Sequence, residues 1–483
     1  MSADAVKTRF APSPTGEIHL GNLRTALFNV LLARSRGGCF LLRIEDTDLE
    51  RSHEIWVRAL IDDLRWLGLA WQEGPDVGGE DGPYRQSQRG DLYERYYRRL
   101  EEGGRSYPCF CSDTQLRLSR KAQRAAGQAP RYAGTCAKLA PDEVRRRLDE
   151  GQLPSIRFRV PAGETLAFDD LVRGPQRFAS DDIGDFIIRR SDGSPAFFFS
   201  NAIDDALMGV THVLRGEDHL TNTPRQLMIL RALGLRSPLY GHLSLLVGAD
   251  GSPLSKRNGS RSVRELREQG YLPAAILNYL ARLGHSCDDD AWLDLEGLAA
   301  CFSLDRLGRA PARFDEPQLR YWQKLSVERL DRQAIGDWLD GSPQGPEIRR
   351  RVPAELRDDF LDCIRDNIEY PADALAWARR LFDELPPPDG DELEILRGAG
   401  GAFFLAALEK LDEDGFRAFA KAVGDRVGVK GKALFMPLRV ALTGVQHGPE
   451  MARLWALLGR DRCRERLRAA ARISETEDRG NSG

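Results

Sequence analysis

The sequence lacks the features that mark a membrane or secreted protein. In its 483 residues no apolar run approaches the roughly 20 residues that a membrane-spanning helix needs. The opening residues, MSADAVKTRF, contain no apolar segment of the kind found in secretory signals. We therefore expect a cytoplasmic protein that does not contact membranes.

Two common nucleotide-binding motifs are also missing. The chain contains neither a GxGxxG dinucleotide fingerprint nor a GxxxxGK[ST] phosphate loop, so dehydrogenases and P-loop enzymes lose their main support. A formal net charge of −3 neither indicates nor excludes nucleic-acid binding, since a basic face can be balanced by an acidic one. Eight cysteines in a chain without a secretory signal favour free thiols over a disulfide framework.

What the sequence does contain is a candidate phosphate site near its N-terminus. A β run over 8–11 is broken by Pro12 and Pro14, and we expect a helix to begin near His19–Gly21. Its apolar residues recur at the spacing of one buried helical face: Leu20, Leu23, Leu27, Val30 and Leu31. A strand, a glycine-containing loop and a helix N-terminus bring together free backbone N–H groups that bind phosphate.

Two further strands are expected to end in charged residues. A strand over Cys39–Ile44 leads into Glu45-Asp46-Thr47-Asp48, and a strand over Val210–Leu214 leads into Arg215. Open α/β sheets bind ligands just beyond the carboxyl ends of their strands. These acidic and basic side chains are therefore candidates for a polar ligand site.

The rest of the chain changes character twice. Between about 108 and 195, short alternating apolar runs and Gly/Pro turns indicate an α+β insertion that splits the sheet. We expect a strand over Ala196–Phe199 after the insertion, and a helix near Pro224 with Thr223 as its N-cap. From about residue 326 onward nearly every segment has a helical pattern.

His19 gains meaning from a second basic loop, Ser255-Lys256-Arg257-Asn258-Gly259. Alone, a histidine at a helix start bonds backbone or water, and a basic loop is a solvated turn. Together they suggest a site in which His19 and Lys256 face a triphosphate from two sides. Cations and preorganised donors suit nucleotidyl transfer, because charge spreads over phosphate oxygens in the transition state.

These motifs, in this order, resemble those of the bacterial glutamyl-tRNA synthetases, which are class I aminoacyl-tRNA synthetases. The stretch His19-Leu20-Gly21-Asn22 is similar to the HIGH signature of that class, and Leu254-Ser255-Lys256-Arg257 is similar to its KMSKS loop. Other matching stretches are RFAPSPTGEIHLGN, LLRIEDTD, GPYRQS, NAIDDALMGVTHVLRGEDHLTNTPRQ, GYLPAAILNYLARLG and MPLRVALTG. The resemblance covers nearly the whole chain.

The resemblance implies an α/β fold with several parts. We expect a Rossmann-like catalytic domain with a parallel sheet, an α+β insertion that binds the tRNA acceptor stem, and an all-α anticodon-binding region. The expected divisions are catalytic halves at 1–107 and 196–244, the insertion at 108–195, a stem-contact region at 245–325, helical subdomains at 326–385 and 392–473, and a flexible tail at 474–483.

The resemblance also implies a reaction. ATP, with Mg²⁺, and L-glutamate would form glutamyl-adenylate, and the acyl group would pass to the 3′ end of tRNA(Glu), with activation dependent on tRNA. Two alternatives stay open: tRNA(Gln) as the main or an additional substrate, and a paralogue that binds tRNA without activity. The expected form in solution is a monomer.

For ATP, the family motifs imply a set of backbone and side-chain contacts in which His19 and Lys256 are catalytic. His19 would contact the phosphates, Gly21 would let the adenine side approach the backbone, and Lys256 would stabilise charge on the departing pyrophosphate. Pro253 replaces the first lysine of the KMSKS-like loop, so one phosphate contact is missing. The implied ATP-binding residues are Pro14, Thr15, Gly16, His19, Gly21, Asn22, Ser255, Lys256 and Arg257.

For glutamate, two arginines would take the two carboxylates, because an arginine fork binds a carboxylate bidentately. Which arginine takes which carboxylate stays open, and an ion pair with a nearby acid is the alternative for either. Glu45 would bind the α-ammonium, helped by Ser13 and the Ala11 backbone. Phe197 stands where the family has a tyrosine, which removes a hydrogen bond of about 1 kcal/mol. The implied glutamate-binding residues are Arg9, Ala11, Ser13, Glu45, Phe197, Asn201 and Arg215.

Three cysteines match a zinc-binding spacing seen in some members of this family: Cys109, Cys111 and Cys136. The usual fourth ligand is a histidine, but Lys138 stands there, and lysine is not a normal zinc ligand. Tyr132 occupies a position that supplies a phenolate ligand in the related glutamyl-queuosine synthetases. Three thiolates with Tyr132 or water could hold Zn²⁺; three metal-free structural thiols are the alternative.

Overall fold

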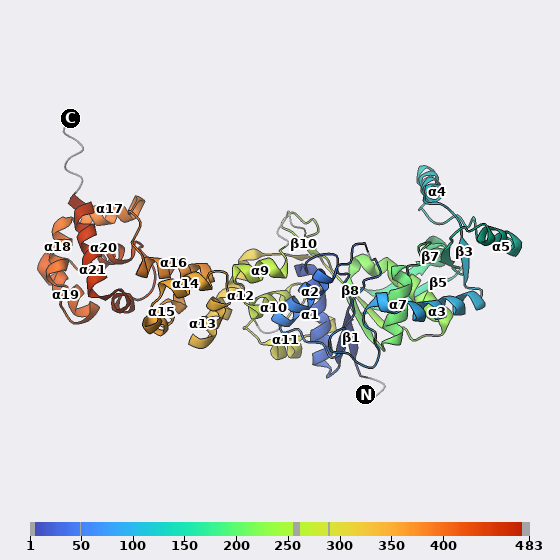
Figure 1. Ribbon diagram of the computed structural model, residues 1–483, viewed down its shortest axis with the longest axis horizontal. Coiled ribbons are helices and arrows are strands. Elements are labelled where there is room, and N and C mark those ends of the chain that lie inside the picture. Colours follow the sequence, from blue (N-terminus) through green and yellow to red (C-terminus); the bar gives the residue numbers. More distant parts are fainter. Residues whose placement is uncertain (1–4, 49, 255–260, 288–289, 476–483) are drawn as a thin grey trace. The chain divides into compact units, whose positions relative to one another are not determined.

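The computed structural model describes residues 5–48, 50–254, 261–287 and 290–475. The chain separates into two units (Figure 1). Unit 1 comprises Met1–Glu265 and Pro273–Trp322, and unit 2 comprises Leu266–Leu272 and Gln323–Gly483. Among the described residues, no helix is both long enough and apolar enough to cross a membrane.

The N-terminal strand and helix form as their pattern predicts. The strand β1 (Lys7–Phe10) is buried along its whole length, and α1 (Leu20–Ser35) begins directly after its N-cap, His19. Every residue of the expected apolar face is buried in α1. The helix ends before Gly37, whose φ of +57° suits a residue without a side chain.

Unit 1 contains short parallel strand pairs. The strand β2 (Cys39–Leu42) pairs with β1 and places Arg9 opposite Leu41. The strands β8 (His212–Gly216) and β9 (Leu239–Leu243) pair with Arg215 opposite His242. The Thr211 N–H donates to the Lys7 carbonyl and the Lys7 N–H donates to the Thr211 hydroxyl, which holds β1 beside β8. A third parallel pair is formed by β10 (Leu246–Val247) and β11 (Ala312–Arg313).

The insertion is an α+β region, as its pattern predicts. Its antiparallel sheet has the strand order β3-β4-β7, and a separate hairpin is made by β5 and β6 (Figure 1). The end of this hairpin contacts β9, where the Leu171 N–H donates to the Tyr240 carbonyl. The elements of the insertion are β3 (Ser106–Cys109), α4 (Asp113–Ala125), α5 (Pro141–Asp149), β4 (Ser155–Phe158), β5 (Thr165–Asp170), β6 (Gly174–Ala179), α6 (Ser180–Ile183) and β7 (Phe186–Arg189).

Other helices cover the strands or continue beyond them. The helices α9 (Val263–Gln269) and α12 (Glu316–Glu328) contain residues of both units. The remaining helices of unit 1 are α2 (Glu54–Trp66), α3 (Gly90–Glu102), α7 (Phe197–Leu207), α8 (Thr223–Leu233), α10 (Pro273–Arg282) and α11 (Leu295–Cys301).

The strand expected over Ala196–Phe199 is wrong. Ala196 is the N-cap of α7, and the three phenylalanines form its first turn. A run of aromatic residues suits a strand equally well, but here the rings pack in different directions. Phe199 stacks on Tyr97 of α3 with ring centroids 4.1 Å apart, whereas Phe198 lies edge-on to Phe186 of β7. Tertiary packing therefore overrides local propensity.

Thr223 is not the N-cap of α8. Asn222 occupies that position, Thr223 is the first helical residue, and neither side chain caps the helix in the structure. The Thr223 hydroxyl instead accepts a hydrogen bond from Arg215 at 2.8 Å. The polar residue expected to stabilise a helix end is thus used to hold a side chain of the adjacent strand.

Not all the cysteines are free thiols. Cys287 and Cys301 form a disulfide with a Cα–Cα separation of 6.0 Å, so the expectation of free thiols is wrong for this pair. The end of α11 returns close enough to the residues after α10 for the two side chains to bond. The other six cysteines are free.

All the regular elements of unit 2 among the described residues beyond Gln323 are helices, joined by loops. This agrees with the helical pattern after residue 326. Pro437 lies inside α20, and Gly459 marks a kink in α21. The helices are α13 (Arg332–Asp340), α14 (Gly345–Arg351), α15 (Arg357–Ile364), α16 (Pro371–Phe382), α17 (Gly390–Ala399), α18 (Gly401–Glu409), α19 (Gly415–Val427), α20 (Lys432–Thr443) and α21 (Met451–Glu475).

Candidate functional site

A pocket of about 500 Å³ opens at the ends of β1 and β8, beside the N-terminal turn of α1. Most of the expected substrate-binding residues line it: Arg9, Ala11, Ser13, Thr15, Gly21, Asn22, Glu45, Phe197, Asn201 and Arg215. Pro14, Gly16 and His19 are not part of its wall. Ser255, Lys256 and Arg257 lie outside the described residues, so the structure does not place them.

The first turn of α1 forms one wall of this pocket. A Cβ built on Gly21 would meet no atom within 4 Å, so the helix surface there is open. His19 is the N-cap but makes no capping bond, and its buried Nδ1 has no hydrogen-bond partner among the described residues. The first N–H groups of a helix have no partner within it, so this turn can receive an anionic group.

Arg9 is held from behind by a buried acid. Its Nε lies 3.2 Å from the Asp205 carboxylate of α7, and the fully buried Arg43 lies 2.7 Å from the same group. Burial opposes ionisation of Asp205, but the charges of Arg9 and Arg43 outweigh it and lower the pKa of that carboxyl. Arg9 thus has an ion-pair partner and still reaches the pocket.

Glu45 supplies the negative charge of the pocket. Its carboxylate accepts hydrogen bonds from Asn201 at 2.5 Å and from Arg43 at 3.2 Å. Burial raises the pKa of Glu45 although Arg43 and Arg9 act to lower it. A cationic group bound in the pocket would stabilise the ionised form of this side chain.

Arg215 differs from Arg9 because no carboxylate of the described residues lies within hydrogen-bond distance of its guanidinium. Its Nε donates to His242 at 3.1 Å, and its Nη2 donates to Thr223 at 2.8 Å and to Gln226 at 2.6 Å. Its Nη1 is buried and has no hydrogen-bond partner within the part of the chain that the structure describes. Burial without a neutralising acid lowers the pKa of Arg215 to about 10. A ligand carboxylate would supply the missing partner.

Phe197 faces His219 at the pocket, with ring centroids 5.2 Å apart. Burial is the main cause that lowers the pKa of His219 to about 4, so the imidazole is neutral at pH 7. The two rings contribute a neutral, aromatic part of the pocket wall.

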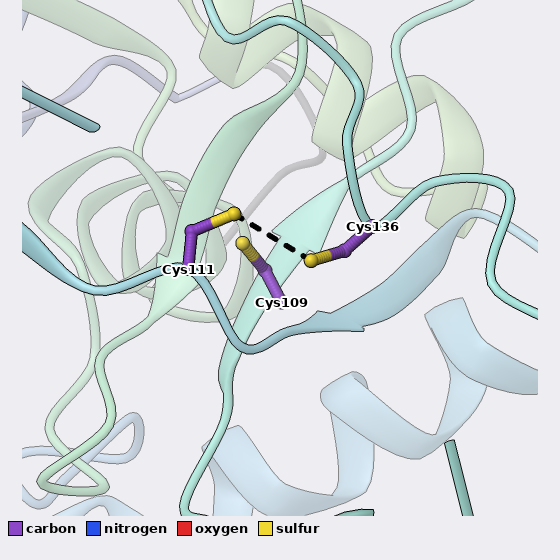
Figure 2. A group of neighbouring side chains, drawn as sticks. All are labelled: Cys109, Cys111 and Cys136. Atoms are coloured by element: carbon purple, nitrogen blue, oxygen red, sulfur yellow. Dashed lines mark hydrogen bonds between the residues drawn. The ribbon is translucent and has the colours of Figure 1, made fainter. Parts of the chain in front are cut away.

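The three cysteines of the insertion gather as their spacing suggests. Figure 2 shows their sulfur atoms turned toward one another, and all three lie within 4.8 Å of each other. The Tyr132 hydroxyl lies 3.4 Å from the Cys109 sulfur and 3.6 Å from the Cys111 sulfur. Burial opposes ionisation of Cys109, but hydrogen bonds from Tyr132 and Arg157 outweigh it and lower its pKa to about 7. Lys138 is exposed and is not in the cluster.

Sequence reasoning missed the residues that hold the pocket from behind. Asp205, Arg43 and His242 are all buried. Asp205 contacts Arg9, His242 contacts Arg215, and Arg43 contacts the carboxylates of Asp205 and Glu45. Only the adjacent acids of NAIDDAL gave a signal, because two charged residues in an apolar helix must find partners inside the protein. No sequence feature distinguished His242.

Two family models match the chain. The model described as the catalytic domain of class I tRNA synthetases (E and Q) matches residues 5–321. The model described as an anticodon binding domain matches residues 366–471. Together they cover most of the two units.

Individual relatives match at full length. A protein of Alkalilimnicola ehrlichii named glutamate–tRNA ligase 2 is 59% identical over 481 residues, which is 99% of this chain and 100% of that protein. A protein of Nitrosococcus oceani with the same name is 60% identical, covering 97% of this chain and 98% of that protein. The solved glutamate–tRNA synthetase of Elizabethkingia anophelis superimposes with a TM-score of 0.87 at 27% identity, covering 97% of this chain and 100% of that one.

Proposed function

This chain belongs to the class I tRNA synthetases of the glutamate and glutamine type, and we propose that it is a glutamate–tRNA ligase. It uses ATP, with Mg²⁺, to convert L-glutamate to glutamyl-adenylate and transfers the glutamyl group to the 3′ end of tRNA(Glu). Full-length relatives at 59% and 60% identity carry the same activity in their names.

The observation that carries this proposal is the charge pattern of the pocket. Glutamate has two carboxylates and one ammonium group, and the pocket presents Arg9, Arg215 and Glu45. Arg215 has no acidic hydrogen-bond partner of its own, and its free Nη1 suits a carboxylate better than an amide. This favours glutamate over glutamine as the amino acid.

The proposed roles are those that the family resemblance implies, and for the residues that line the pocket their position supports them. Arg9 and Arg215 bind the carboxylates of glutamate, and Glu45 with Ser13 and the Ala11 backbone binds its ammonium group. Asn201 and Phe197 complete that side of the pocket. On the ATP side, the phosphates are held by His19 and by the residues of the turn that matches the family motif: Pro14, Thr15, Gly16, Gly21 and Asn22. Lys256, with Ser255 and Arg257, stabilises the pyrophosphate as it leaves.

The test is ATP–pyrophosphate exchange with glutamate, run with and without tRNA. We expect exchange only when cognate tRNA is added. An absence of exchange under both conditions would overturn the enzyme assignment and favour a paralogue that only binds tRNA. Charging assays with tRNA(Glu) and tRNA(Gln) in parallel decide whether the enzyme accepts one or both. Exchange with glutamine in place of glutamate would contradict the role of Arg215.

The working form that we propose is a cytoplasmic monomer. The anticodon domain match at residues 366–471 gives the chain its own module for tRNA recognition, which supports one chain per tRNA. Light scattering of the purified protein, alone and with tRNA, measures the mass of the complex. A mass of two chains would contradict this part of the proposal.

We also propose that Cys109, Cys111, Cys136 and Tyr132 hold a structural Zn²⁺ ion. A tetrahedral site with Zn–S bonds of about 2.3 Å separates its sulfur atoms by roughly 3.8 Å, and the Cys111 and Cys136 sulfurs are 3.6 Å apart. The Tyr132 oxygen lies close to two of the sulfurs and can complete the tetrahedron in place of the usual histidine.

Metal analysis of the purified protein tests this directly. We expect about one zinc per chain, and a Cys136→Ser variant should lose most of it because a tetrahedral site needs each of its thiolates. A Tyr132→Phe variant separates phenolate from water as the fourth ligand, since only a phenolate site loses affinity. A zinc content well below one per chain in the native protein would leave three structural thiols.

A further inference from the structure

Two buried residues outside the substrate pocket lie behind Arg215: His242 contacts Arg215 directly, and Asp170 contacts His242. His242 lies on β9 directly opposite Arg215 on β8, and register partners in parallel strands present their side chains to the same face. Asp170, the last residue of β5 in the insertion, hydrogen-bonds the far side of the His242 ring. The side chains of Asp170 and His242 are both fully buried.

The direction of each hydrogen bond between Arg215, His242 and Asp170 is fixed. The Nε of an arginine can only donate, so the Nε2 of His242, 3.1 Å away, must accept. The ring proton therefore sits on Nδ1, which donates to Oδ2 of Asp170. The other oxygen of Asp170 accepts three backbone N–H groups, from Val172 at 3.0 Å, Arg173 at 2.8 Å and His242 at 3.1 Å.

These hydrogen bonds also determine which N–H groups of Arg215 remain available to a ligand. Three of the five N–H groups of the guanidinium are used by His242, Thr223 and Gln226. Both remaining N–H groups belong to Nη1. Gln226 continues this series of hydrogen bonds. Its amide donates at 2.8 Å to Asn201, which in turn donates to Glu45. The carboxylate end and the ammonium end of the pocket are thus connected by hydrogen bonds of one direction.

We propose that Asp170 and His242 are positioning residues that aim Nη1 of Arg215 into the pocket and so determine its preference for a carboxylate over an amide. This inference rests on the proposed glutamate–tRNA ligase function. Neither residue touches substrate. Asp170 fixes the proton on Nδ1 of His242, and His242 gives Arg215 an acceptor that keeps the guanidinium from rotating.

The proposal predicts that Asp170→Asn reverses the ring proton. The three backbone N–H groups require an acceptor at the Oδ1 position, so the amide oxygen of asparagine must stay there and its NH₂ must face Nδ1 of His242. The proton then moves to Nε2, where it faces the Nε–H of Arg215. We expect the KM for glutamate to rise roughly 10- to 100-fold, the scale of one lost hydrogen bond to a charged group, with the KM for ATP unchanged.

A pair of substitutions at His242 separates orientation from packing. His242→Gln places an amide oxygen where Nε2 was, so it retains an acceptor for Arg215. His242→Asn keeps a donor near Asp170 but is too short to reach Arg215. We expect His242→Asn to raise the KM for glutamate as Asp170→Asn does, and His242→Gln to raise it far less. The selectivity for glutamate over glutamine should follow the same order: it should fall in the His242→Asn variant and be largely preserved in the His242→Gln variant.

The double variant Asp170→Asn/His242→Gln gives the sharpest result. The amide oxygen of glutamine does not depend on a ring tautomer, so Asp170→Asn should add little once His242 is glutamine. Strong non-additivity of the two substitutions is therefore expected. Effects that simply multiply would overturn the proposal, as would equal KM values for the His242→Gln and His242→Asn variants.

A matched control isolates a general loss of stability. Glu73→Gln removes a buried carboxylate that pairs with Lys7 at 2.6 Å in the same unit but does not line the pocket. It should lower the thermal midpoint without changing the glutamate KM or the selectivity for glutamate over glutamine. All KM values are measured by tRNA charging, with native protein in parallel. Native protein that charges nothing contradicts the proposed function, whereas active native protein with unaffected variants contradicts only the positioning role.

Discussion

Arg9 and Arg215 line one pocket but differ in how their charge is balanced. Arg9 pairs with Asp205, and Arg43 pairs with both Asp205 and Glu45, so two acids balance two arginines in this buried cluster before any ligand arrives. Among the described residues, the hydrogen-bond partners of Arg215 are all neutral acceptors. Because an unpaired buried charge is costly, the binding of a carboxylate should depend more strongly on Arg215 than on Arg9.

Replacement of Arg215 by lysine tests whether charge alone is sufficient. An ammonium group cannot bond His242, Thr223 and Gln226 at once and still extend two N–H groups to a ligand. We expect Arg215→Lys to lower kcat/KM for glutamate on the order of 100-fold, mainly through KM. Steady-state charging assays measure this, and a lysine variant with near-native KM would show that geometry is unimportant at this position.

Phe197 provides the contrasting case at the residue scale. Its ring packs against His219 at the side of the pocket. Phe197→Tyr adds one hydroxyl without removing the ring contact, so charging activity should stay equal or rise modestly. A large loss in activity would mean that the pocket has closed around the phenyl ring.

At the scale of elements, α1 contributes both to the core and to the wall of the pocket. Its apolar residues are buried, while its first turn keeps an open surface at Gly21. Gly21→Ala should therefore keep or raise the thermal midpoint, since alanine is favoured over glycine in helices by about 1 kcal/mol. It should also raise the KM for ATP, because the new methyl group projects from the pocket wall.

Gly398 in α17 is a matched control for that substitution. It is also a helical glycine with no atom within 4 Å of an added Cβ, but it lies in unit 2 and outside the pocket. Gly398→Ala should keep or raise the thermal midpoint and leave the KM for ATP unchanged. If both variants raise that KM alike, the effect comes from helix stability and not from the pocket.

The elements that the sequence predicted best are those with a clear period. The helix α1 and the helical character of unit 2 follow from apolar spacing, which depends only on neighbours a few residues apart. The run at 197–199 misled because three consecutive phenylalanines have no period, and contacts with Tyr97 and Phe186 decided its conformation. Local patterns lose their value where distant packing decides.

From the sequence, only the residues that line the candidate site could be predicted, and not the buried residues that hold them. Family motifs named Arg9, Glu45 and Arg215, which the structure brings to one pocket. Asp170 lies 72 residues from His242 along the chain, and neither belongs to a motif quoted for the family. This pair forms because the insertion hairpin packs on β9. A contact between such distant segments leaves no local pattern in the sequence.

At the scale of the whole molecule, the histidines make the two units respond differently to acid. Burial is the largest cause that lowers the pKa of four histidines, all of which lie in unit 1. For one of them, His219, the pKa falls to about 4. In the unfolded chain each imidazole returns to a pKa of about 6.5. The four are His212, His219, His242 and His285.

The sign of the effect follows from proton binding. Below about pH 6.5 the unfolded chain takes up protons that the folded unit 1 refuses, so acid favours unfolding. The stability of unit 1 should fall as the pH drops through 6.5, and for His219 this loss continues toward pH 4. Protonation of His242 would also place a donor against Nε of Arg215, so folding and the pocket should weaken together. Hydrogen exchange at pH 7.5, 6.5 and 5.5, corrected for intrinsic rates, measures this. As the pH is lowered, peptides of unit 1 should lose protection at a higher pH than peptides of unit 2. Protection in unit 1 that increases as the pH is lowered would contradict the neutral, buried state of these histidines.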